Sequence, residues 1–91
     1  MTNFEINMAN REQKRNRTRI ENTLKEHGYE FQTEKVSDHF FISVFPVLDG
    51  ELSVSPTGQM SSTMSGPDGH YGETFDTMEE IIKWVEEYKV N

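Results

Sequence analysis

The sequence predicts a two-layer α+β domain in which two helices cover one face of an antiparallel sheet of three or four strands. Three observations predict it: a helical pattern near each end of the chain, strand-like runs between them, and turn residues that separate those runs. Ninety-one residues are enough for one small core, so we expect a single domain over residues 1–91. The six Phe, three Tyr and one Trp provide bulky side chains to fill that core.

The first helix is predicted over about residues 9–27, because this stretch has no Pro or internal Gly and Gly28 is a favourable stop. Helical spacing places on one face the side chains that can be buried: Ala9, Gln13, Ile20 and Leu24. Upstream, residues 1–8 are expected as a loose arm or, from the alternation of Phe4, Ile6 and Met8, as a short strand.

Two strands are predicted next. Residues 29–36 alternate apolar and polar side chains, which indicates a half-buried strand. Residues 39–47, HFFISVFPV, are aromatic and β-branched on both alternating sets, as in a central strand. The Asp49-Gly50 pair that follows is a strong signal for a two-residue hairpin turn into a third strand.

The register of that hairpin has two solutions. A strict two-residue turn pairs Val47 with Leu52 and leaves Ile42 and its same-face neighbours opposite serines. A bulge at Pro46, which has no N–H to donate, would switch the facing and bring Ile42 to the side of Leu52. Both solutions remain open at this point.

The remaining elements are a weak strand, a loop and a helix. Met60, Ser62 and Met64 share one face of the predicted fourth strand, and the glycine-rich run GPDGHYGET (residues 66–74) predicts a loop. Thr77 and Glu80 have the spacing of a capping box, so a second helix is expected from there to about residue 89. Its apolar face comprises Met78, Ile81, Ile82, Trp84, Val85 and Tyr88.

Charge divides the chain into two parts. Residues 1–27 carry a net charge of +2 and residues 28–91 carry −9, which together give the formal −7. No Lys or Arg occurs over residues 36–82. We therefore expect an acidic body, which repels nucleic acid and attracts basic proteins, with one basic helix attached to it.

The sequence contains no motif for catalysis, a metal or a cofactor. The absence of cysteine excludes disulfides, thiolate zinc sites and cysteine nucleophiles. The spacing of His27, His39 and His70 matches no metal motif, and the run around Asp68 lacks the Lys-Ser/Thr ending of a phosphate-binding loop. We expect a protein that is not an enzyme, has no cofactor or metal, and, lacking a signal or membrane segment, is cytoplasmic.

Acidic residues and one aromatic residue are the predicted contacts for a partner. A strip of carboxylates can imitate a phosphate track and enter the basic groove of a host protein, and a Tyr between glycines can anchor an interface. The predicted partner-binding residues are Asp49, Glu51, Asp68, Tyr71, Glu73, Asp76, Glu79, Glu80, Glu86 and Glu87. Small acidic domains without motifs are typical of phage proteins that inhibit CRISPR or restriction enzymes, an analogy of type that assigns no residue roles.

Two other functions remain open. A basic face on the first helix would suit a small nucleic-acid-associated protein, and it comprises Arg11, Lys14, Arg15, Arg17 and Arg19. The order helix, three strands, helix is similar to that of double-stranded RNA-binding domains, but the second helix here is acidic, which argues against direct binding of nucleic acid. The third function is a structural module that forms homo-oligomers.

Overall fold

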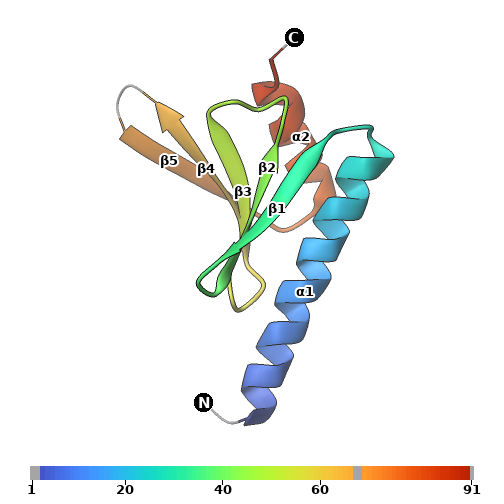
Figure 1. Ribbon diagram of the computed structural model, residues 1–91, viewed down its shortest axis with the longest axis vertical. Helices are drawn as coiled ribbons and strands as arrows, with labels where there is room; N and C mark the ends of the chain where they lie inside the picture. Colours follow the sequence, from blue (N-terminus) through green and yellow to red (C-terminus); the bar gives the residue numbers. More distant parts are fainter. Residues whose placement is uncertain (1–2, 67–68, 91) are drawn as a thin grey trace.

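The strands form one antiparallel meander, and both helices pack against one of its faces (Figure 1). The computed structural model describes residues 3–66 and 69–90, with side chains described for 10–65 and 72–90. The elements are α1 (Asn3–Glu26), β1 (Phe31–Val36), β2 (His39–Val44), β3 (Gly50–Val54), β4 (Met60–Gly66), β5 (Gly69–Phe75) and α2 (Met78–Tyr88). The predicted α+β class is confirmed, but the sheet has five strands rather than three or four.

A hydrophobic cluster lies between the sheet and the helices. Strand alternation turns one set of side chains from β2, β3 and β4 toward the helices, where α1 contributes Ile20 and Leu24. From α2, Trp84 is buried to 2% exposure and packs edge-on to Phe75, with 6.4 Å between the ring centroids. The largest fully buried side chains among the described residues are Ile20, Leu24, Ile42, Val44, Leu52, Val54, Ile81 and Val85.

Helix α1 is longer than predicted. It begins at Asn3, so Phe4, Ile6 and Met8 lie on helical backbone, and the prediction of a strand there is wrong. Their alternation is too short a pattern to distinguish the two structures. The first turns extend past the end of the sheet (Figure 1). The predicted stop is confirmed, because α1 ends at Glu26 and Gly28, two residues further on, has a φ of 77°.

Polar contacts hold the middle of α1 in place. Gln13 is 5% exposed, and its Nε2 donates to the carbonyl of Asp38 at 2.6 Å and to that of Val54 at 3.4 Å. One turn further on, Asn16 Nδ2 donates to the carbonyl of Gly58 at 2.7 Å. Because Ile20 and Leu24 occupy only the C-terminal half of the helix, these hydrogen bonds help to attach its middle to the sheet.

The β2–β3 connection combines one confirmed expectation with one error. Ile42 pairs with Leu52, so the apolar side chains of both strands face the helices, as the second register predicted. The two-residue turn at Asp49-Gly50 is wrong, because β3 already begins at Gly50 and the connection spans residues 45–49. Val47 N–H donates to the carbonyl of Val44 at 2.9 Å, so the chain reverses around Pro46 instead.

The glycine-rich run after β4 is a strand and not the predicted loop. Residues 69–75 form β5, which pairs with the whole length of β4. Gly72 explains the error: a Cβ at this position would collide with the backbone carbonyl oxygen of Ser62 on β4. A glycine inside a strand commonly marks such a close approach, but composition alone suggested a loop.

The start of α2 is as predicted. Thr77 is the N-cap, and its Oγ1 accepts from the Glu80 N–H at 3.2 Å while Glu80 Oε1 accepts from the Thr77 N–H at 3.1 Å. Each side chain thereby satisfies a backbone N–H that has no partner within the helix. Between β3 and β4 the chain turns over residues 55–59, with Gly58 at a φ of 93°.

Candidate protein-binding surface

Three of the predicted carboxylates meet at one cleft between β5 and α2, which we call the acidic cleft. Glu73 comes from β5, and Glu80 and Glu87 lie two turns apart on α2. The cleft has a volume of about 280 Å³, and Phe75 and Trp84 also line it. Lys83 is the one cation among its lining residues. Because Phe75 and Trp84 are almost completely buried, the cleft offers a partner mainly its carboxylates, which suit a lysine or arginine side chain.

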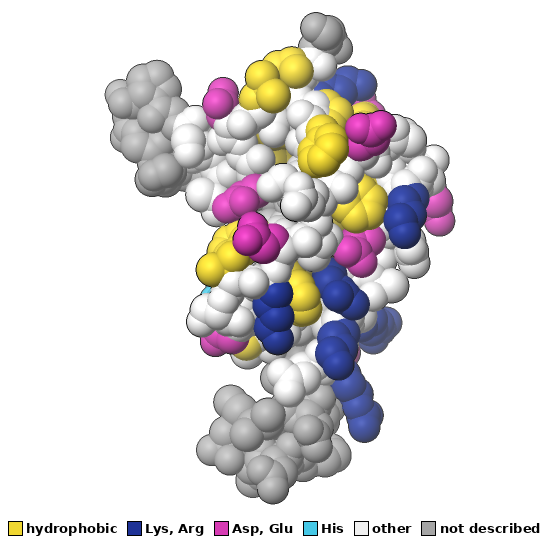
Figure 2. All heavy atoms as spheres, in the orientation of Figure 1, with side chains coloured by type: hydrophobic (Ala, Val, Ile, Leu, Met, Phe, Trp, Pro, Cys, Tyr) yellow, Lys and Arg dark blue, Asp and Glu magenta, His cyan; other side chains and the backbone are white. Residues whose placement is uncertain are grey.

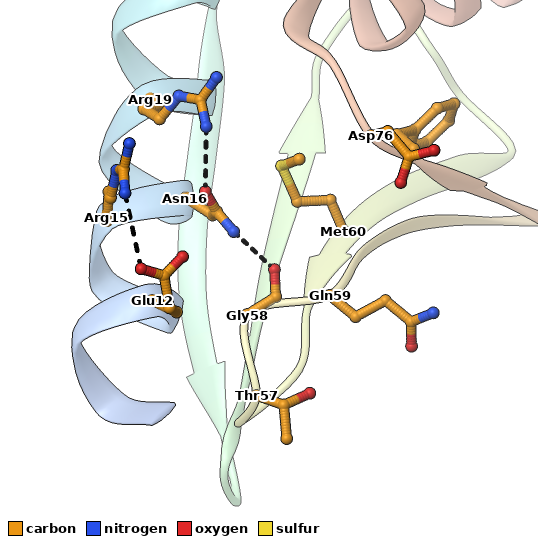
Figure 3. A pocket seen from close by; sticks show the side chains of 10 residues that line it. Glu12, Arg15, Asn16, Arg19, Thr57, Gly58, Gln59, Met60 and Asp76 are labelled. Atoms are coloured by element: carbon orange, nitrogen blue, oxygen red, sulfur yellow. Dashed lines mark hydrogen bonds and ion pairs between the residues drawn. The ribbon is translucent and has the colours of Figure 1, made fainter. Parts of the chain in front are cut away.

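The other predicted acids lie elsewhere. Asp49 and Glu51 line a depression of about 390 Å³ at the β2–β3 connection, together with Leu48. Asp76 lines a cleft of about 600 Å³ between α1 and the turn at residues 55–59 (Figure 3). Glu79 lines a third hollow, between the two helices. The predicted residues therefore do not form one continuous strip.

The cleft drawn in Figure 3 has mixed charge. Arg15 and Arg19 of α1 lie on one side of it, and Asp76 lies on the side of α2. Arg15 Nη1 is 3.6 Å from Glu12 Oε1, and Arg19 Nη1 donates to Asn16 Oδ1 at 3.4 Å. Since the arginines contact neighbours on their own helix and an acid faces them, the cleft presents no concentrated positive charge to an anion.

Two of the predicted partner residues have internal roles. Glu80 accepts hydrogen bonds in the capping box, as described above. Glu86 accepts a hydrogen bond from the Tyr29 hydroxyl, and its other carboxylate oxygen lies 2.8 Å from Lys89 Nζ. Lys89 also lies over the Tyr29 ring, 5.7 Å from its centroid. Glu86 therefore belongs to a clasp of Tyr29, Glu86 and Lys89 that ties the end of α2 to the residues before β1.

The clasp shifts the pKa values of its members. Hydrogen bonds from Lys89 and Tyr29 lower the pKa of Glu86 below its ordinary value of 4.5. The hydrogen bond to Glu86 raises the pKa of Tyr29 above 10.0, and that of Lys89 above 10.5. The clasp is thus complete only with a charged Glu86, a neutral Tyr29 and a charged Lys89.

The clasp predicts a pH dependence of stability. A lowered folded-state pKa stabilises the fold above the unfolded pKa of Glu86, so this contribution is lost as the pH falls from about 5 through the folded value. We expect Glu86→Gln to lose less stability than the wild type over that acidic range, measured by urea unfolding at a series of pH values. Glu79→Gln, which changes an exposed acid of the same helix, is the control. Identical pH profiles for wild type and Glu86→Gln would contradict the clasp.

Most of the predicted basic side chains of α1 are exposed to solvent. Arg11, Lys14, Arg15 and Arg19 are exposed, and Lys and Arg side chains gather over α1 in the lower part of Figure 2. Arg17 differs, because its guanidinium lies 4.8 Å from the centroid of the Phe40 ring and its Nε lies 3.9 Å from Glu21 Oε1. Four of the five predicted cations therefore remain available at the surface.

Two predicted partner residues have no described side chain. Asp68 lies outside the described residues. Tyr71 lies in β5, opposite Met64, so its predicted position in a loop is wrong, and its side chain is not described.

The described histidines contact neighbouring residues. His27 Nδ1 donates to the Thr23 carbonyl at 2.9 Å, and His39 Nδ1 donates to the Asp38 carboxylate at 2.8 Å. No group of three or more potential metal ligands occurs within residues 3–66 and 69–90.

The sequence interpretation missed an exposed apolar group at one end of the sheet. Among the described residues the exposed large hydrophobic side chains are Val36, Phe45, Leu48 and Val90, and three of these four lie at the β2–β3 connection or beside it. For Phe45 the signal is the apolar character of both alternating sets in residues 39–47, which also predicts a central strand.

No model of a known protein family matches this chain, and no curated protein or solved structure is significantly similar to it. Neither helix, over the part of the chain that the structure describes, combines the length and apolar character needed to cross a membrane.

Proposed function

We propose that this chain is a non-enzymatic protein-binding domain that uses its acidic surface against the basic groove of a nucleic-acid-processing enzyme. The observation that carries the proposal is the acidic cleft, where Glu73, Glu80 and Glu87 from two elements line one hollow. Glu73 and Glu87 are exposed and engage in no ion pair within the described residues. Their charge is therefore available to a partner.

The inhibitory role follows from what the partner's groove normally holds. A basic groove that binds phosphates also attracts carboxylates, so a protein that occupies it competes with nucleic acid. CRISPR and restriction effectors contain such grooves, and a phage-type inhibitor is the role that this surface would serve.

The test is capture of basic proteins on the immobilised chain. We expect proteins retained at low salt to be released as salt approaches about 0.3 M, where interactions between exposed charges reach only a few ångströms. A duplex DNA fragment should displace them as well. The variant Glu73→Gln with Glu87→Gln should retain severalfold less. Glu80 is left unchanged because it caps α2.

The matched control carries the same loss of charge on another element. Glu30 directly before β1 and Glu34 within it are both exposed, so Glu30→Gln with Glu34→Gln removes two carboxylates away from the cleft. Equal retention by both double variants would contradict the proposal, as would retained proteins that DNA does not displace. A gel shift of the duplex by the chain alone, abolished by Arg11→Ala with Lys14→Ala, would instead assign nucleic-acid binding to α1.

A further inference from the structure

The β2–β3 connection presents an apolar surface, which we call the apolar cap and define as Phe45, Leu48 and Val90. Their side chains are 51%, 72% and 54% exposed. Val90 joins the other two because its N–H donates to the Pro46 carbonyl at 2.8 Å, which places the C-terminal segment against the connection. Figure 2 shows hydrophobic side chains at the upper end of the view, where this connection and the C-terminal residues lie in Figure 1.

The backbone that carries the cap is held from several sides. Phe45 N–H donates to the Glu30 carbonyl at 3.0 Å, and the Asp49 carbonyl accepts from the Ser65 N–H at 2.8 Å. Between them, Val47 is 5% exposed and anchors the connection in the core. A surface that is already ordered loses little conformational entropy on binding. Phe45 and Leu48 are thus held outward by a fixed backbone.

The charge beside the apolar cap distinguishes between a second copy of this chain and a different protein as its binding partner. Asp49 and Glu51 line the same depression as Leu48. If two copies met cap to cap, two-fold symmetry would bring the carboxylates of both chains into one interface, where they repel one another. A different protein that combines apolar side chains with flanking lysine or arginine would satisfy both features of the surface.

We propose that the apolar cap is the anchoring site for a protein segment that presents apolar side chains flanked by basic ones. Phe45, Leu48 and Val90 receive the apolar side chains, and Asp49 and Glu51 receive the flanking cations. In interfaces of this kind a few apolar and aromatic contacts supply most of the affinity, while charges accelerate the encounter. The proposal rests on the proposed function only in that the partner is basic.

The experiment uses a labelled amphipathic helical peptide of leucine and lysine, with fluorescence anisotropy as the readout. We expect saturable binding to the full chain at physiological salt, and a dissociation constant raised about tenfold or more by Leu48→Ser and by Phe45→Ser. Asp49→Asn with Glu51→Gln should weaken binding at low salt more than at high salt. A peptide with serine in place of leucine should bind weakly to all variants.

Val36→Ser is the matched control. Val36 is 49% exposed, but it ends β1 and pairs with His39 at the start of β2, away from the β2–β3 connection. Equal dissociation constants for Val36→Ser and Leu48→Ser would overturn the proposal. So would absence of binding, or a wild-type dimer in sedimentation that Leu48→Ser dissociates. Thermal melts followed by circular dichroism establish that each variant is folded.

The outcome is separable from that of the proposed function. Loss of peptide binding in Leu48→Ser, with binding retained in Glu73→Gln with Glu87→Gln, supports the cap whether or not the acidic cleft binds a groove. Loss only in the Glu73 and Glu87 double variant would assign the peptide to the acidic cleft and overturn the cap.

Discussion

Replacing Gly58 by alanine is expected to lower the free energy of unfolding by about 3 kcal/mol. Gly58 has a φ of 93°, where any L side chain is strained. A Cβ there would also lie 2.8 Å from Glu12 Cβ and 3.1 Å from the Glu12 carbonyl carbon. Because the second atom belongs to the helix backbone, α1 itself must move away, and the Asn16 hydrogen bond to Gly58 must stretch with it.

Gly28→Ala separates the cost of the left-handed backbone from the cost of the steric clash with α1. Gly28 has a φ of 77°, yet a Cβ there meets nothing within 4 Å. This variant should lose only the cost of the left-handed backbone, about 1 kcal/mol. Urea unfolding of both variants measures the difference, which reports the contact between the turn and α1. Equal losses would show that α1 does not depend on the close approach at Gly58.

Leu24→Ala is expected to cost about 3 kcal/mol as well, because it opens a cavity under the C-terminal half of α1. Leu24 has 0% exposure and, with Ile20, forms the whole described apolar contact of this helix with the core. Asn22→Ala, two residues away on the exposed side, should change stability by less than about 0.5 kcal/mol. A loss below about 1 kcal/mol for Leu24→Ala would mean that α1 packs loosely.

Gly58→Ala and Leu24→Ala can be combined in one chain. Residues 12 and 24 are about 18 Å apart along a helix, so Gly58→Ala and Leu24→Ala act at separate contacts and their effects should add within about 0.5 kcal/mol. A combined loss well below the sum would indicate that one substitution already releases the whole of α1 from the sheet.

The sequence predicted the parts of this fold whose pattern is local. The apolar face and the capping box of α2 are determined within one element, and the buried face of Gln13, Ile20 and Leu24 follows from helical spacing. The fifth strand was missed because its requirement for glycine comes from the Ser62 carbonyl on another strand. The residue pattern of β5 alone does not indicate that contact.

The candidate site also combines features that the local sequence predicts with features that depend on distant contacts. Acidic composition was evident, but which carboxylates are available depends on contacts between distant residues. Tyr29 and Glu86 are 57 positions apart, and their hydrogen bond engages an acid that helix periodicity placed on the open surface. Likewise, the exposure of Phe45 and Leu48 depends on hydrogen bonds with the backbone of Glu30, Ser65 and Val90, which fix the connection that carries them.

The strand order β1-β2-β3-β4-β5 has a consequence for how the chain folds. Every strand pairs with its neighbour in sequence, so each hairpin closes only a short loop and the sheet forms without bringing distant segments together. Proteins dominated by such local contacts fold fast for their size. Long loops are closed when α1 docks on the sheet, as in the Asn16 contact with Gly58, and when it meets α2. We therefore expect the rate-limiting search to be the docking of the two terminal helices on a sheet that is already paired.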